Sequence, residues 1–487
     1  MKLGDSPLKS AIIVVSLRWI DRLIGFVSTL ILARLLMPED FGLIAMASIV
    51  IGLAEAMLDV GVNVFLIQAR NPSSAHYNTG WTVRILQGFL LFLLLSSASP
   101  FVAQYFGDER VQFVLIGLAF AGWVATFENV GVVNFQREMR FSQEFRYLFT
   151  RRIFGFFVTI GLALALRSYF ALVIGTVTMR LFGVALSFWM HPMRPRLSLE
   201  KVSEMMGVSI FLMLKNIFMY VDGNFHKVLL GGGTNTTSMG GYTVACEVAD
   251  LPSSEVLSPI NRVLFPMLTR ARDDIHEQLR IMNLTQGIHL LITIPVSIGL
   301  CLLADETVRI LLGEKWIFVV GALQIVAFFN ITSSVISAPN YLMMANGFFK
   351  VVMWISFVQL CLFGFAFSFS PWPITMENVA LMRLVCLGLG TIFGYYVFKK
   401  LVPQAQIKDL FANSIRPVLA SIAMTLFIVY FVFGAISDRN EVSRFMITAL
   451  TGALVYGVTV VLLWLLQSRP AGPEMYVFER LKERFGK

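Results

Sequence analysis

Apolar runs long enough to cross a bilayer recur along the whole chain, and this feature limits the chain to one class of fold. Each run holds about 20 residues, which is the length that an α-helix needs to span the hydrocarbon core. A transmembrane barrel would instead show short segments of alternating hydrophobicity. Only 14% of the residues are charged, against about 25% in soluble domains. The sequence therefore predicts an all-α, polytopic membrane protein.

The apolar runs predict about 14 transmembrane helices. We place them at residues 11–36, 41–67, 80–103, 111–135, 152–166, 169–190, 206–230, 241–266, 281–303, 317–343, 350–370, 379–398, 416–435 and 443–466. Lys and Arg are roughly four times as frequent in the loops on the N-terminal side as in the opposite loops, and the positive-inside rule makes that side cytoplasmic. We therefore expect both termini in the cytoplasm. This placement also explains the net charge of +9 without nucleic acid as a partner.

Two helices carry basic residues at the same spacing, which suggests an internal repeat. Arg22 and Arg34 are twelve residues apart, as are Lys215 and Lys227, and each pair precedes a short apolar run and a turn. Internal repeats are common in transporters, although a match this short can also arise by chance. A true repeat gives two pseudo-symmetric six-helix lobes around a central cavity. The lobes would be residues 1–200 and 201–400, with two further helices and a cytoplasmic amphipathic tail in 401–487.

Charged side chains at membrane depth concentrate in the first three helices and in the seventh and eighth. A charge at the bilayer centre costs about 2.5–3.5 kcal/mol, so these residues are expected to face the protein interior or a water-filled cavity. The basic and amide residues of this set are Arg18, Arg22, Arg34, Arg84, Lys215 and Asn216. The acidic residues, with the one histidine among them, are Asp21, Glu55, Asp59, Asp222, His226, Glu247 and Asp250.

A cavity that contains these cations suits an anionic solute, above all one with phosphates, which arginine binds in a bidentate manner. The carboxylates would balance the charge or carry a coupling ion, H⁺ or Na⁺. His226 belongs to the one residue type that titrates near neutral pH, although a single histidine is more often structural. The alternative for each residue is internal ion pairing, for example of Arg18 or Arg22 with Glu55 or Asp59, which would only hold helices together.

The segment 136–152 interleaves Phe141, Phe145 and Phe149 with five arginines. This pattern fits a helix lying on an anionic leaflet. The interpretation that we favour is charge that sets the topology, combined with local packing.

The sequence contains no recognisable catalytic or metal-binding pattern. No Ser or Cys lies in a known nucleophile motif with a histidine, and no histidine pair has metal spacing. No Gly-rich phosphate loop is present, and the four cysteines are scattered through apolar segments as ordinary thiols. We therefore expect neither an enzyme nor a bound metal or cofactor.

The stretch ARLLMPEDFGLIAMA at residues 33–47 carries a family resemblance, together with LDVGVNVFLIQ at 58–68 and NFQREMRF at 134–141. It resembles the polysaccharide transporters, or Wzx-type flippases, of the multidrug/oligosaccharidyl-lipid/polysaccharide exporter superfamily. The resemblance implies two six-helix lobes that alternate the opening of a central cavity. It also implies translocation of undecaprenyl-diphosphate-linked oligosaccharides across the bacterial inner membrane.

The partners implied by the resemblance are the lipid-linked oligosaccharide, membrane lipids and, in the same pathway, a polysaccharide polymerase and glycosyltransferases, with the chain itself a monomer. One alternative is a cation-coupled small-molecule exporter of the same superfamily, whose pocket should be acidic and aromatic. The excess of arginine in the first lobe argues against it. The second alternative is a non-transporting partner in an envelope-assembly complex. Such a partner would not need charged residues along one face of two equivalent helices.

Overall fold

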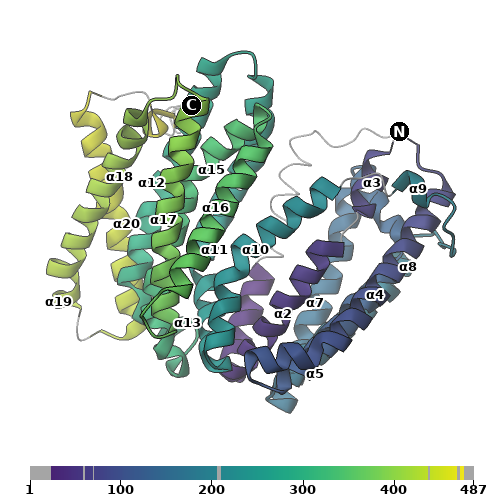
Figure 1. Ribbon diagram of the computed structural model, residues 1–487. Coiled ribbons are helices and arrows are strands. Elements are labelled where there is room, and N and C mark those ends of the chain that lie inside the picture. Colours follow the sequence, from purple (N-terminus) through teal and green to yellow (C-terminus); the bar gives the residue numbers. More distant parts are fainter. Residues whose placement is uncertain are drawn as a thin grey trace. The chain divides into compact units, whose positions relative to one another are not determined.

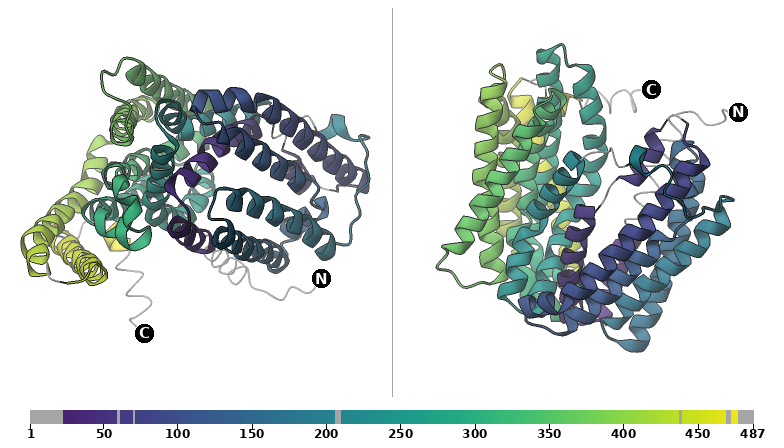
Figure 2. Two further views of the ribbon diagram at one scale, coloured as in Figure 1. Left: turned by 90° about the horizontal axis from the view of Figure 1, so that it is seen from below. Right: turned by 45° about the vertical axis from the view of Figure 1, so that its right-hand side comes forward.

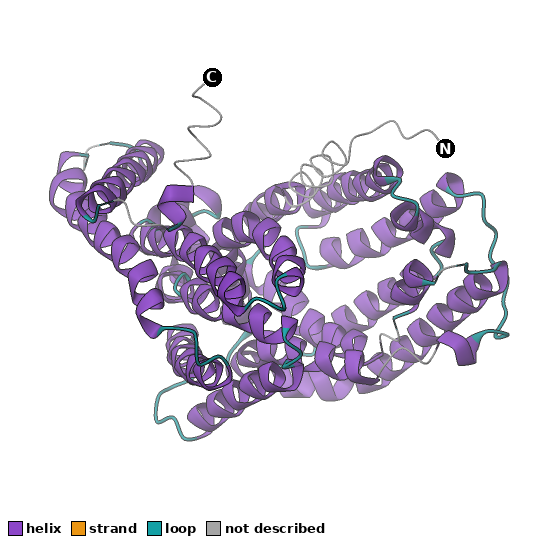
Figure 3. Cartoon of the chain, turned by 90° about the horizontal axis from the view of Figure 1, so that it is seen from above, coloured by secondary structure: helices purple, strands orange, loops and turns teal. Residues whose placement is uncertain are grey.

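A computed structural model describes residues 23–58, 61–69, 71–205, 210–436, 439–468 and 472–476. Figure 3 shows that these residues form helices and loops, without a strand among them. The chain divides into two compact units, Met1–Thr243 and Val244–Lys487, which are coloured purple to teal and teal to yellow in Figure 1. The all-α prediction is confirmed. The division at residues 200 and 400 concerns an internal repeat and stays a prediction.

Ten helices within the described residues are long and apolar enough to cross a membrane, and a bent pair, Arg110–Thr126 with Val130–Arg137, makes an eleventh. The predicted polytopic membrane protein is therefore confirmed. The predicted seventh and eighth spans, 206–230 and 241–266, fall on α10 (Ile210–Gly233) and α11 (Thr236–Arg270), which are not among these ten helices. Both helices carry several charged or titratable residues, which lower their mean hydropathy. The count of 14 spans stays a prediction.

Unit 1 is a bundle of antiparallel helices. Its elements are the helix Leu23–Leu35, α2 (Pro38–Leu58), α3 (Val62–Gln68), α4 (Ser74–Phe106), α5 (Arg110–Thr126), a 3₁₀ turn Val130–Val132, α6 (Val133–Arg137), α7 (Phe141–Leu166), α8 (Phe170–Met190), α9 (Val202–Met205), α10 (Ile210–Gly233) and the first turns of α11 (Thr236–Arg270). Helix α4 packs along α5, α7 along α8, and α5 also contacts α2 and α8 (Figure 2). Helix α10 packs against α2.

Within the described residues, unit 2 continues from α11 through nine further α-helices. They are α12 (Ile275–Leu302), α13 (Ala304–Leu311), α14 (Val320–Val326), α15 (Phe329–Ala345), α16 (Phe349–Ser368), α17 (Met376–Leu401), α18 (Ile407–Phe427), α19 (Phe433–Ala435) and α20 (Glu441–Leu466). Helix α12 packs against α15 and α18, and α18 packs against α20. Leu268, Leu342 and Phe398 are fully buried in an apolar cluster of this unit.

Several helix boundaries differ from the sequence prediction, among them those of the second and fifth predicted spans. The span placed at 41–67 is broken, because α2 ends at Leu58 and Gly61 adopts a left-handed backbone (φ 69°) before α3 begins. The span placed at 152–166 is a longer helix, Phe141–Leu166, which takes up most of the basic segment 136–152. A separate surface helix there was thus a wrong alternative. The phenylalanines of this segment continue the apolar periodicity of α7.

The Pro-Glu-Asp-Phe-Gly motif, residues 38–42, forms the first turn of α2 and contacts several elements at one end of unit 1. Pro38 is the first residue of α2, the position where a missing N–H costs least. Glu39 lies 3.6 Å from the Arg110 guanidinium at the start of α5. The buried carboxylate of Asp40 accepts hydrogen bonds from the backbone N–H of Met37 (2.9 Å) and of Tyr169 (2.8 Å). The motif that carries the family resemblance is therefore a structural junction.

The same turn touches the beginning of α11 backbone to backbone. A Cβ atom on Gly42 would lie 1.8 Å from the carbonyl oxygen of Thr236, and one on Gly240 would lie 2.1 Å from that of Pro38. Only glycine lets two backbones approach this closely. The first turns of α2 and α11 are thus in direct contact, within unit 1 alone.

Two ion pairs connect helices and segments within unit 2. Arg444 of α20 donates a hydrogen bond to Glu306 at 2.8 Å. Arg416 of α18 lies 3.1 Å from Glu474, and the side chains of this pair are 4% and 7% exposed. A pair this deeply buried is strongly destabilising to break, because the remaining charge has no compensation.

We expect Glu474→Ala to lower the unfolding free energy by about 3–5 kcal/mol, since it leaves the buried Arg416 without its carboxylate. The matched control is Glu441→Ala, because Glu441 lies 4.0 Å from Arg309 and is half exposed. An exposed pair contributes about 0–1 kcal/mol. Thermal unfolding in detergent measures both variants, and equal shifts in Tm would show that the buried pair has no special role.

Candidate functional site

A polar cavity of about 770 Å³ lies within unit 1, between α2, α3, α4, α5 and α10. Its lining consists of Gly52, Glu55, Ala56, Asn63, Arg84, Gln87, Gly88, Leu91, Gly122, Thr126, Met219, Tyr220 and Asn224. Volumes of this order are typical of ligand sites. Seven of these side chains are polar or charged, although the helices α2 and α4 that carry several of them belong to the membrane-spanning set.

Three glycines from three helices create the space for this cavity. A Cβ on Gly52 of α2 would lie 2.3 Å from the Tyr220 hydroxyl, and one on Gly88 of α4 would lie 2.5 Å from Cγ2 of Thr126. A Cβ on Gly122 of α5 would lie 4.0 Å from a carboxylate oxygen of Glu55. Larger residues at these positions would fill the cavity or displace its polar groups.

Tyr220 fixes the wall that α10 contributes. Its hydroxyl donates a hydrogen bond to the Ile49 carbonyl of α2 at 2.9 Å. One turn further on, the Asn224 amide donates to the Tyr220 carbonyl at 3.0 Å. The contact between α10 and α2 therefore brings Tyr220 and Asn224 to the same cavity as the charged residues of α2 and α4.

Arg84 and Glu55 are the charged residues of the cavity, and amides and hydroxyls surround them. Arg84, Gln87 and Glu55 each have an interaction partner. A guanidinium with nearby amide and hydroxyl donors can bind phosphate oxygens, and the carboxylate can accept hydrogen bonds from sugar hydroxyls. The arrangement thus suits a polar, anionic solute that carries hydroxyl groups.

The predicted site residues fall into four groups. The structure brings Glu55 and Arg84 together in the cavity, along with Asn63 of α3. Four of the predicted residues lie outside the described part of the chain: Arg18, Asp21, Arg22 and Asp59. Lys215 and Asn216 belong to α10, but the structure describes only the backbone there.

The remaining predicted residues lie elsewhere in the described structure. Arg34 is exposed at the end of the helix Leu23–Leu35, and Asp222 is half-buried on α10. His226 is 5% exposed and packs edge-on against the Tyr242 ring, with ring centroids 5.6 Å apart. Glu247 and Asp250 are exposed on the part of α11 that belongs to unit 2. Their roles in binding and coupling stay predictions.

Three features were not predicted from the sequence: the uncharged side chains of Tyr220 and Thr126, the cavity glycines, and Arg180. Tyr220 and Thr126 lie in apolar surroundings that resemble ordinary helix packing, and the cavity glycines gain meaning only from neighbouring helices. Arg180 could have been singled out from the sequence, because it is the one charged residue in the apolar helix α8. Its buried Nε has no hydrogen-bond partner among the described residues. Within the described part of the chain, no group of His, Cys, Asp and Glu could hold a metal ion.

Comparisons with known proteins agree with this picture. The chain is 26% identical over 451 residues to the "Uncharacterized membrane protein in cps region" of Klebsiella pneumoniae, covering 90% of this chain and 91% of the relative. It is 25% identical over 386 residues to the lipopolysaccharide biosynthesis protein WzxC of Escherichia coli (strain K12), covering 77% of each.

Among solved structures, the fold resembles that of the lipid II flippase MurJ in an inward closed conformation. The TM-score is 0.73 at 14% identity, over 94% of this chain and all of that one. At this identity the likeness concerns the fold alone. The polysaccharide biosynthesis protein family matches residues 31–321, which is more than half of the chain. The chain is therefore a member of the polysaccharide biosynthesis protein family.

Proposed function

We propose that this chain is a flippase that moves an undecaprenyl-diphosphate-linked oligosaccharide across the bacterial inner membrane by alternating access. The observation that carries this proposal is the cavity of unit 1, where Arg84 lies at membrane depth among amides, hydroxyls and a carboxylate. A glycan headgroup needs such a polar path, whereas its lipid can remain in the bilayer. Membership of a polysaccharide biosynthesis family and the similarity to WzxC support the same substrate class.

We further propose that the chain acts as a monomeric transporter and not as an enzyme, with both termini in the cytoplasm. A polysaccharide polymerase and glycosyltransferases would be its pathway partners. Transport would be coupled to H⁺ or Na⁺, and Glu55 is the carboxylate in the described cavity that could carry this ion. A small-molecule exporter of the same superfamily is the alternative, since the fold also resembles that of a multidrug transporter (TM-score 0.56). The arginine in the cavity favours the anionic substrate.

The proposed function predicts that Arg18→Ala with Arg22→Ala causes lipid-linked oligosaccharide to accumulate in cells, because two further cations for the diphosphate are lost. Extraction and quantification of the lipid-linked intermediate measure this effect at matched protein levels. Arg167→Ala serves as the control, since Arg167 is exposed at the end of α7. Normal export in the double variant would exclude these two arginines from the site. Normal polysaccharide in a strain without the chain would contradict the proposed function itself.

A further inference from the structure

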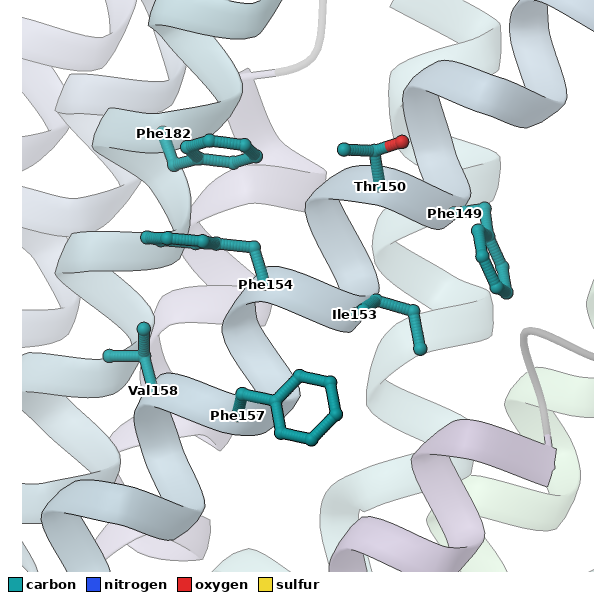
Figure 4. Close-up of a pocket in the computed structure, with 7 residues that line it drawn as sticks. All are labelled: Phe149, Thr150, Ile153, Phe154, Phe157, Val158 and Phe182. Atoms are coloured by element: carbon teal, nitrogen blue, oxygen red, sulfur yellow. The ribbon is translucent and has the colours of Figure 1, made fainter.

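A second cavity of about 500 Å³ lies on the surface of unit 1, between α7 and α8. Its lining is Phe149, Thr150, Ile153, Phe154, Phe157, Val158 and Phe182. Figure 4 shows six of these side chains along α7 and Phe182 on α8. The rings of Phe154 and Phe182 stack with centroids 3.9 Å apart and planes at 16°. Phe157 is 66% exposed, so the groove is open along its outer side.

The groove begins at the charged end of α7 and extends into its apolar part. All charged residues of α7 precede residue 153, and residues 153–166 contain none. The lining from Phe149 to Val158 covers about 14 Å at the helical rise of 1.5 Å per residue. The end of the groove at Phe149 and Thr150 thus lies at the level where lipid headgroups meet acyl chains, and the rest of the groove faces hydrocarbon.

A cation stands at the charged end of this groove. Arg146 is exposed and precedes Phe149 and Thr150 by three and four residues, so all three share one helix face. The next arginine of α7, Arg151, is bound to Glu128 at 2.8 Å. Arg146 has no ion pair among the described residues. The exposed hydroxyl of Thr150 lies one turn along the same face.

We propose that this groove binds an anionic glycerophospholipid of the surrounding bilayer, with one acyl chain along the phenylalanines and its phosphate at Arg146 and Thr150. The apolar walls fit a hydrocarbon chain, and the open side gives access from the membrane. A single guanidinium matches the single negative charge of a headgroup such as phosphatidylglycerol. A polyprenyl diphosphate carries more charge than this end of the groove compensates. The proposal does not depend on the transported substrate.

Lipid titrations of the full-length protein, followed by native mass spectrometry, test this site. Phosphatidylglycerol is expected to bind more tightly than phosphatidylcholine. Arg146→Gln is expected to weaken phosphatidylglycerol binding about five-fold, the loss typical of one basic residue near an anionic surface. Arg167→Gln, at the opposite end of α7, should leave it unchanged. Ile153→Trp, which fills the groove, should weaken both lipids.

Equal binding of the two phospholipids, or equal effects of Arg146→Gln and Arg167→Gln, would overturn the proposal. So would displacement of phosphatidylglycerol by undecaprenyl diphosphate at a lower concentration, which would assign the groove to the carrier lipid. If Arg146→Gln does not fold, Arg146→Lys replaces it. The lysine variant should still prefer phosphatidylglycerol, and loss of that preference would contradict a charge-based site.

Discussion

Replacing Gly42 by alanine is expected to abolish transport and to lower stability. The added Cβ would lie 1.8 Å from the Thr236 carbonyl oxygen, so the first turn of α2 and that of α11 would have to separate. Overpacking usually costs about 1–3 kcal/mol, and a clash with backbone leaves little room for relaxation. Gly240→Ala should act in the same way, because its Cβ would lie 2.1 Å from the Pro38 carbonyl oxygen.

The matched control is Gly161→Ala in α7, where a Cβ would meet no atom within 4 Å. This change should be neutral or slightly stabilising, since alanine favours the helix. Lipid-linked oligosaccharide in cells and Tm in detergent measure all three variants. Normal transport and Tm in Gly42→Ala would contradict the direct backbone contact between α2 and α11.

Arg84→Gln is the second change for which we expect a large effect, a loss of transport rate of about 10- to 100-fold. The amide keeps much of the side-chain volume but removes the cation of the cavity. Hydrogen bonds to charged groups contribute about 1.5–3 kcal/mol each, which corresponds to this range. Arg84→Lys should be intermediate, because lysine keeps the charge and loses the bidentate geometry. Flipping rates at matched protein amounts measure the series.

A second variant separates substrate binding from internal ion pairing at this position. If Arg84 only neutralises a carboxylate such as Glu55, Arg84→Gln alone should lower the Tm, and the double variant Arg84→Gln with Glu55→Gln should restore it. A double-mutant cycle detects such coupling. If Arg84 binds the substrate, the double variant should be at least as slow as Arg84→Gln alone, with Tm close to that of the unchanged protein.

Hydropathy was sufficient to predict the all-α membrane fold, because the cost of exposing backbone in lipid allows few alternatives. The cost of membrane-depth charge pointed to Arg84 and Glu55, which the structure places in one cavity. The helix break at Gly61 was not predictable in this way, since the hydropathy of an apolar run is the same whether its helix is continuous or broken. The beginning of α7 at Phe141 was missed because arginines lower hydropathy without ending a helix.

Tertiary contacts account for the rest of what the sequence concealed. The Pro-Glu-Asp-Phe-Gly motif predicted a turn, but the partner of Asp40 is Tyr169, 129 residues away. Gly52 and Gly88 shape the cavity only because Tyr220 and Thr126 lie opposite them. Such pairs depend on which helices are neighbours, and neither local propensity nor periodicity contains that information.

Reconstitution of the purified chain in liposomes with an undecaprenyl-diphosphate-linked oligosaccharide tests the proposed flippase activity. A membrane-impermeant glycosidase added outside measures how fast the glycan crosses from the inner leaflet. We expect the unchanged protein to expose the glycan of the inner leaflet rapidly, and Arg84→Gln to slow this exposure at least ten-fold. Exposure no faster than in protein-free liposomes, with the protein folded and correctly inserted, would contradict the proposed flippase activity.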